Sequence, residues 1–168
     1  MSIEEAYNFR RFDERLTTSG VVTVEQLHDL RRGGYDAVIN LLPDSHEHAV
    51  PGEARIVEEL GLDYVSIPVD FDAPTHADLV AFTEAMDTRA GRRVHVHCAA
   101  NYRVSAFLAL YLLGNRALSE PQADALVHDV WDPYARPAWN EFMMDEVARA
   151  RSEPRAPEPH AEQETKRP

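Results

Sequence analysis

The chain has 168 residues, 44% of them hydrophobic, and carries 29 acidic against 17 basic residues for a net charge of −12. This length and composition are typical of one domain with a buried core. No cluster of lysine or arginine stands out that could hold a phosphodiester backbone, so we expect no nucleic-acid partner.

The first 100 residues predict strands that alternate with helices. Thr23 and Gln26 form a capping box at the start of one helix, and Thr75 with Asp78 begins another. Apolar runs bounded by turn residues indicate strands. In chain order, we expect a strand over 15–19, a helix from 24 to Gly33, a buried strand over 36–42, a helix over 53–60, a strand over 63–69, a helix from 75 to about 90 and a strand over 93–97.

The rest of the chain predicts helices and a tail. Residues 104–113 are apolar on nearly all sides, which indicates a helix buried at the centre of the domain. Ser119 begins a helix that should reach about Trp131, and Pro137 opens the last one, to about Arg149. The segment 151–168 is rich in proline and charge and is expected to be a disordered tail after a domain over 1–150.

This order of elements predicts an α/β fold. We expect a single domain with a mostly parallel central sheet of about four to five strands, flanked by helices. In such folds, ligands bind at the carboxyl ends of the strands.

Cys98 is the only cysteine, and it lies between a predicted strand and a predicted helix, in the run Val-His-Val-His-Cys-Ala-Ala-Asn-Tyr-Arg over 94–103. A thiol in that place lies near unpaired N–H groups and the positive end of a helix dipole, and both favour the thiolate. The same N–H groups can hold a phosphate. Because the polar residues Asn101, Tyr102 and Arg103 follow in the same run, we predict a nucleophile rather than a small core residue.

The absence of other cysteines and of lysines narrows the chemistry. One cysteine allows no internal disulfide and no cysteine-rich zinc site. Lys166 is the only lysine, so an active-site cation in the folded part must be Arg or His. The N-terminus has no basic segment followed by an apolar one, and no run approaches the ~18 apolar residues that span a bilayer. We expect a cytoplasmic protein without a membrane partner.

The segment from His97 and Cys98 through Arg103 and Ser105, with Ile-Pro-Val-Asp over 67–70 and Tyr-Asp-Ala-Val-Ile-Asn-Leu over 35–41, resembles the cysteine-based protein tyrosine and dual-specificity phosphatases. It is particularly similar to bacterial members related to the phosphatase-like domain of β-lactamase-hydrolase-like proteins. The resemblance covers roughly 11–139 and implies a protein-tyrosine-phosphatase-like fold of the dual-specificity type. It also implies a cysteinyl-phosphate intermediate and no metal or organic cofactor.

The resemblance implies roles for the other residues. His97 would keep the thiol acidic, although from the residues alone we expect it to bond to backbone near Cys98. Ser105 would help the thiolate leave. The implied phosphate-binding residues are Ala99, Ala100, Asn101, Tyr102 and Arg103.

The general acid would be an aspartate of the loop after the third predicted strand. Asp70 and Asp72 are both candidates, and we favour Asp70 because it comes first after that strand. Either could instead cap the helix that follows or face solvent.

The spacing of the motif departs from the family signature. Four residues separate Cys98 from Arg103, where the family has five and places Ser or Thr directly after the arginine. Because Ser105 keeps the family's distance from Cys98, we interpret the loop as one of normal length, with the arginine displaced and Val104 in its usual place. Asn101 stands where many members have Gly, and Asn also tolerates positive φ.

Two other functions stay open. Rhodanese-type sulfurtransferases have a shorter cysteine loop, so Cys98 could carry a persulfide. Alternatively, the displaced arginine could leave a phosphate-binding module without turnover. For the phosphatase, we expect a phosphorylated protein or a small phosphomonoester as substrate. The pairs His95 with His97 and His46 with His48 lack a third ligand and make a weak case for zinc.

Overall fold

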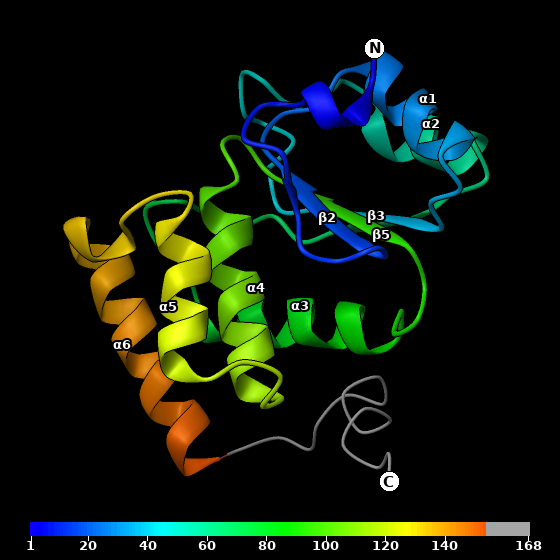
Figure 1. Cartoon of the computed structure of the whole chain (residues 1–168). Helices are drawn as coiled ribbons and strands as arrows, with labels where there is room; N and C mark the ends of the chain where they lie inside the picture. The colour runs from blue at the N-terminus through cyan, green and yellow to red at the C-terminus, as the bar shows by residue number, and fades with distance from the viewer. Residues whose placement is uncertain (154–168) are drawn as a thin grey trace, which may run out of the picture. The chain divides into compact units, whose positions relative to one another are not determined.

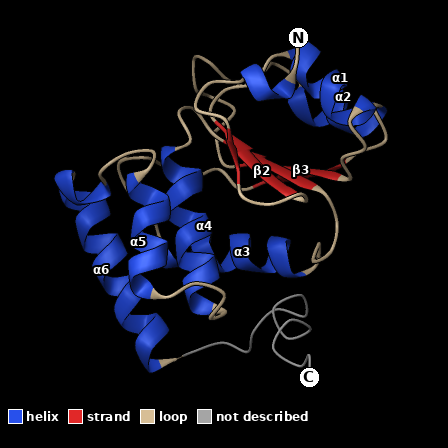
Figure 2. Ribbon diagram, in the orientation of Figure 1, coloured by secondary structure: helices blue, strands red, loops and turns tan. Residues whose placement is uncertain are grey.

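The computed structural model describes residues 1–153, which form two compact units (Figures 1 and 2). The first unit comprises 1–70 and 91–104, and the second comprises 71–90 together with the described residues from 105 onward. The sheet belongs to the first unit. Three α-helices lie in the second unit, and a fourth begins in the first unit and continues into the second. Residues 154–168 of the predicted tail lie outside the described part of the chain.

The first unit is built around a five-stranded sheet of order β1-β2-β5-β3-β4. Strand β5 pairs in parallel with β2 on one side and β3 on the other, and only β1 is antiparallel. The C-terminal end of β5 therefore lies between the ends of two parallel neighbours. The elements of this unit are a 3-10 helix η1 (Ile3–Glu5), β1 (Arg10–Arg11), β2 (Leu16–Ser19), α1 (Val24–Arg32), β3 (Ala37–Asn40), α2 (Glu53–Glu59), β4 (Asp63–Ser66) and β5 (Val94–His97).

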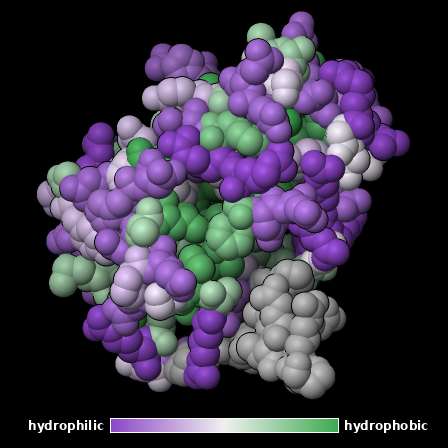
Figure 3. Space-filling model, viewed as in Figure 1, coloured by the Kyte–Doolittle hydropathy of each residue, from purple (hydrophilic) through white to green (hydrophobic). Residues whose placement is uncertain are grey.

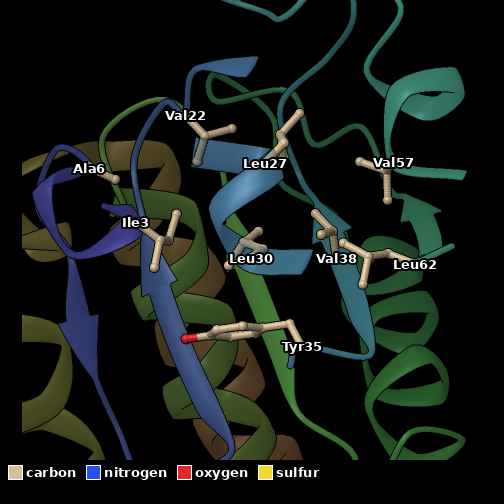
Figure 4. Packing of buried hydrophobic residues seen from close by; sticks show 9 residues of the cluster. All are labelled: Ile3, Ala6, Val22, Leu27, Leu30, Tyr35, Val38, Val57 and Leu62. Carbon is tan, nitrogen blue, oxygen red and sulfur yellow. The ribbon is translucent and has the colours of Figure 1, made fainter. Parts of the chain in front are cut away.

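A hydrophobic core lies between the sheet and the helices of this unit (Figure 4). Leu27 and Leu30 of α1 and Val57 of α2 are fully buried and face the strand residue Val38. Each such side chain stabilises the fold by about 1.5–3 kcal/mol on burial. The N-terminus of α1 is fixed by the predicted capping box, because Thr23 and Gln26 each bond to the other's backbone N–H.

The second unit is helical. It contains α3 (His76–Asp87), α5 (Glu120–His128), the 3-10 helix η2 (Pro133–Ala135), α6 (Pro137–Ser152) and most of α4 (Tyr102–Gly114). Phe107 of α4 packs against Phe82 of α3 and Phe142 of α6, with ring centroids 5.9 and 5.6 Å apart. Figure 3 shows hydrophobic residues at the surface of this unit. Leu110 and Leu113 of α4 line a hollow.

The structure confirms the predicted α/β fold with a mostly parallel sheet of five strands. The two-residue strand β1 was not predicted, because it is too short to show an alternating pattern. Helix α6 continues to Ser152, so Arg151 belongs to a helix and not to the tail, and its guanidinium bonds to Glu120 at 2.8 Å. Among residues 1–153, no helix combines the length and apolarity needed to cross a bilayer.

Candidate active site

Cys98 directly follows β5, the strand at the centre of the sheet. Its N–H donates to the Ser19 carbonyl at 3.3 Å, which extends the pairing with β2 by one residue. The side chain is fully buried. Burial alone would also suit a core thiol, so a nucleophilic role for Cys98 depends on the loop that follows.

The loop after Cys98 has its carbonyl groups fixed from one side. The Ala99 carbonyl accepts from the N–H of Val21 at 2.8 Å, and the Ala100 carbonyl accepts from Asn8 Nδ2 at 3.0 Å. In a trans peptide, the C=O and N–H of one plane point in opposite directions. The N–H of Ala100 therefore points away from Val21. When the carbonyls of a loop point outward, its N–H groups point inward, which is the arrangement that an anion-binding nest requires.

Gly20 allows the loop to approach β2. A Cβ at this position would lie 2.4 Å from the Ala99 carbonyl oxygen and 2.9 Å from the Ala100 Cα, closer than side chains are found to approach backbone. Gly20 and Ala100 also form an isolated β-bridge. A role for this glycine was not predicted, because the only signal in the sequence was its place directly after a predicted strand.

Asn101 turns the chain into α4. Its φ of 67° confirms the prediction of a left-handed residue here. The side chain is fully buried and donates through Nδ2 to the Asn8 carbonyl at 2.8 Å and to Thr18 Oγ1 at 3.0 Å. Asn8 itself has a φ of 51°. The contact joins residues 93 positions apart, and nothing local to Asn8 in the sequence could have indicated it.

Helix α4 begins at Tyr102, two residues earlier than predicted, because the turn is complete at Asn101. Tyr102 and Arg103 are therefore the first residues of a helix, and their placement in the loop was wrong. Their amides are among those that lack intrahelical acceptors and can face an anion. Arg103 is buried, and its Nη1 donates to the Val69 carbonyl at 3.1 Å. This contact fixes the backbone that leads into Asp70.

His97 does not bond to the backbone near Cys98 in this structure, so that expectation was wrong. Its Nε2 lies 2.6 Å from Glu53 Oε2, and both side chains are buried. The carboxylate can only accept, so Nε2 carries a proton. Glu53, the first residue of α2, was missed, because an acidic residue in the first turn of a helix is ordinarily explained by the helix dipole.

His95 ties β5 to β2. Its Nδ1 lies 2.8 Å from Thr17 Oγ1, and its Nε2 lies 2.8 Å from Ser19 Oγ. Burial, and to a smaller extent the nearby His97, lowers the pKa of His95 well below 6.5. Within the described residues, no group of three or more His, Cys, Asp or Glu side chains could hold a metal ion.

A sequence model of the family described as "Beta-lactamase hydrolase-like protein, phosphatase-like domain" matches residues 8–114, a span that includes Cys98, Arg103 and the whole sheet. The chain belongs to this family. A curated member, the β-lactamase hydrolase-like protein of Xylella fastidiosa strain Temecula1, is 34% identical over 119 residues. The alignment covers 69% of this chain and 27% of that protein. The chain thus spans about a quarter of the length of the curated relatives that it matches.

Solved structures have the same phosphatase-like fold. A DUF442 protein of Shewanella putrefaciens CN-32, named provisionally as a phosphatase, is 36% identical and superposes with a TM-score of 0.80. The superposition covers 88% of this chain and 93% of that one, so both units belong to one domain. Tk-PTP has the same fold, at 22% identity with a TM-score of 0.68, over 84% of this chain and 97% of its own.

The predicted residues of this phosphatase-like domain divide between the two units. The first contains Cys98, the loop after it, Arg103, His97 and Asp70. Asp72 belongs to the second unit and is exposed, and Ser105 lies buried in the first turn of α4. Helix α3 is capped by Thr75 and Asp78, as predicted. The remaining predicted phosphate-binding residues, Ala99, Ala100, Asn101 and Tyr102, follow Cys98 directly.

Proposed function

We propose that this domain hydrolyses phosphomonoesters through a phosphoenzyme formed on Cys98. The observation that carries the proposal is the arrangement after β5, where the loop carbonyls of Ala99 and Ala100 bond outward and helix α4 starts immediately after the turn at Asn101. A thiol next to a helix N-terminus and a nest of amides suits a dianionic phosphate. Membership in a phosphatase-like family supports the same reaction.

The reaction has two steps. In the first, the Cys98 thiolate attacks phosphorus, an S–P bond forms, and the P–O bond to the leaving group breaks while an aspartic acid gives its proton to the departing oxygen. In the second, the aspartate takes a proton from water, the water oxygen bonds to phosphorus, and the S–P bond breaks to release phosphate and thiolate. Arg103 and the loop amides stabilise the charge on the three phosphate oxygens in both steps.

Asp70 is the general acid in this proposal. The hydrogen bond from Arg103 to the Val69 carbonyl links the phosphate-binding arginine to the residue before Asp70, which supports this assignment over Asp72. The proposal assigns to Ser105, in the first turn of α4, the role of stabilising the leaving thiolate. The substrate is a phosphorylated protein or a small phosphomonoester, and we place the reaction in the cytoplasm, where the single thiol stays reduced.

Hydrolysis of p-nitrophenyl phosphate tests the proposal. Cys98→Ser should abolish phosphate release, and Arg103→Ala should lower kcat/KM about 10- to 100-fold through the loss of a hydrogen bond to a charged group. Asp70→Asn should flatten the decline of the rate with rising pH, with Asp72→Asn as the matched control. Acid quench of the wild type with labelled substrate should trap label on Cys98.

The same preparation separates the alternatives. Phosphate release that survives Cys98→Ser would contradict the mechanism. Thiocyanate formation from thiosulfate and cyanide, without phosphate release, would assign the chain to the sulfurtransferases. Saturable phosphate binding without turnover would indicate a binding module.

A further inference from the structure

The N-terminal segment and the loop after Cys98 hold each other through two asparagines. Asn8 Nδ2 donates to the Ala100 carbonyl at 3.0 Å, and Asn101 Nδ2 donates to the Asn8 carbonyl at 2.8 Å. The residue before Asn8 makes a third contact, because the carbonyl of Tyr7 accepts from the Gly20 N–H at 2.7 Å. The segment around Asn8 is therefore attached both to the loop and to the end of β2.

Both asparagines have a backbone conformation that side chains disfavour. Asn8 has a φ of 51° and Asn101 one of 67°, and they are two of the three non-glycine residues with positive φ among residues 1–153. Such conformations persist where surrounding contacts determine them, and they cluster at functional sites. Here the side chain of Asn101 bonds to the carbonyl of Asn8, and the side chain of Asn8 bonds to the carbonyl of Ala100, the residue before Asn101.

The peptide group to which Asn8 donates lies just before the start of α4. The Ala100 carbonyl belongs to the plane that joins Ala100 to Asn101, and rotation of this plane would change the direction in which the chain enters α4. Helix α4 carries Arg103 as its second residue. The orientation of this one peptide therefore affects both the loop amides and the origin of the guanidinium.

We propose that Asn8 is a positioning residue for oxyanion binding, and that it acts through the Ala100 carbonyl to hold the loop in the shape that accepts a phosphate. The inference rests on the proposed phosphatase function. Residues of the N-terminal segment, far from Cys98 in sequence, thus belong to the support of the site. Asn8 is half-buried and lies outside the main hydrophobic core, so its substitution is expected to alter the loop more than the fold.

Three variants separate the hydrogen bond from the backbone conformation. Asn8→Gly keeps positive φ accessible and removes only the side-chain donor. Asn8→Ala removes the donor and also disfavours the positive φ. Asn8→Asp keeps the shape, but its carboxylate cannot donate to a carbonyl and would repel it. Asn115→Gly is the control, because its side chain is buried and bonds to the Ala117 N–H, outside the loop.

The readout is the dissociation constant of tungstate, a tetrahedral oxyanion, measured by titration calorimetry on the full chain, together with kcat/KM and the thermal midpoint. Asn8→Gly should weaken tungstate binding about 10-fold and lower kcat/KM to a similar extent, as expected when one N–H of the displaced loop no longer bonds to the charged oxyanion. Asn8→Ala and Asn8→Asp should weaken it further. Asn115→Gly should lower the thermal midpoint and leave tungstate binding unchanged.

The outcomes separate this inference from the proposed function. A wild type that binds no tungstate and releases no phosphate contradicts the proposed function itself. A wild type that binds tungstate while Asn8→Gly binds it equally well overturns the inference alone. A loss of affinity in Asn8→Gly that is matched by Asn115→Gly at equal loss of stability also overturns it, because the effect would then follow from stability.

Discussion

The replacement of Gly20 by alanine should damage the loop after Cys98 without replacing any residue of that loop. The new Cβ would lie 2.4 Å from the Ala99 carbonyl oxygen, whereas ordinary contact begins at 3.4 Å. Either the loop or the end of β2 must therefore move by about 1 Å. Backbone lies on both sides of this contact, so no flexible side chain can absorb the overlap.

The movement has a cost in stability and in rate. Overpacking of this kind costs about 1–3 kcal/mol, and the hydrogen bond from Val21 to the Ala99 carbonyl, worth about 1 kcal/mol, lies at the point of overlap. A misplacement of 1 Å in a catalytic group can lower a rate about 100-fold. We expect Gly20→Ala to reduce kcat/KM on p-nitrophenyl phosphate by about that factor, more than its loss of stability would explain.

Gly114→Ala is the matched control for Gly20→Ala. Gly114 ends helix α4, and a Cβ there would meet nothing within 4 Å. We expect its activity to be unchanged and its stability to shift by less than about 1 kcal/mol. Both variants are compared by urea unfolding and by initial rates below KM. If Gly20→Ala kept kcat/KM within about twofold of the wild type, a close approach of β2 to the loop could not be what shapes the site.

Three further substitutions test the support of the site. Asn101→Ala should unfold about 1–2 kcal/mol more easily than Asn101→Gly in urea, since only alanine adds left-handed strain, and equal values would contradict this. Glu53→Ala should cost about 1–3 kcal/mol by leaving the buried Nε2 of His97 without its hydrogen-bond partner, and Glu53→Gln clearly less; equal losses would show that this hydrogen bond does not stabilise the fold. The lowered pKa of His95 means that the unfolded chain gains a proton below pH 6.5 while the native one does not, so stability falls by up to about 1.4 kcal/mol per pH unit there. His95→Gln should show a smaller fall between pH 7.5 and 5.5, and an unchanged fall would exclude His95 as its cause.

The helix starts were predictable because their signals are local. Thr23, Thr75 and Ser119 each cap a helix through a residue three positions later, and all three capping boxes are present. The left-handed turn at Asn101 follows from the same kind of reasoning, since the residue itself tolerates the conformation. The order of the strands could not be predicted in this way, because pairing between strands depends on contacts that no single segment contains.

The residues that support the site could not be predicted, because their contacts join segments that are far apart in the sequence. Asn8 contacts a residue 93 positions away, and Glu53 pairs with His97 across 44 positions. A half-buried asparagine and an acidic residue at a helix start each have an ordinary local explanation, so the sequence offered no reason to single them out. Gly20 is similar, since the space that it leaves is visible only against the loop.

The displaced arginine lies at the start of α4. Successive residues on a helix point about 100° apart, so an arginine at 103 and one at 104 would leave α4 in different directions. Val104 is fully buried, and a guanidinium there would replace an apolar side chain with no exposed surface. Arg103 is also buried, but it has a carbonyl partner at Val69, next to the favoured general acid. If an arginine at the start of this helix binds the anion, as proposed above, it is Arg103, the second residue of α4.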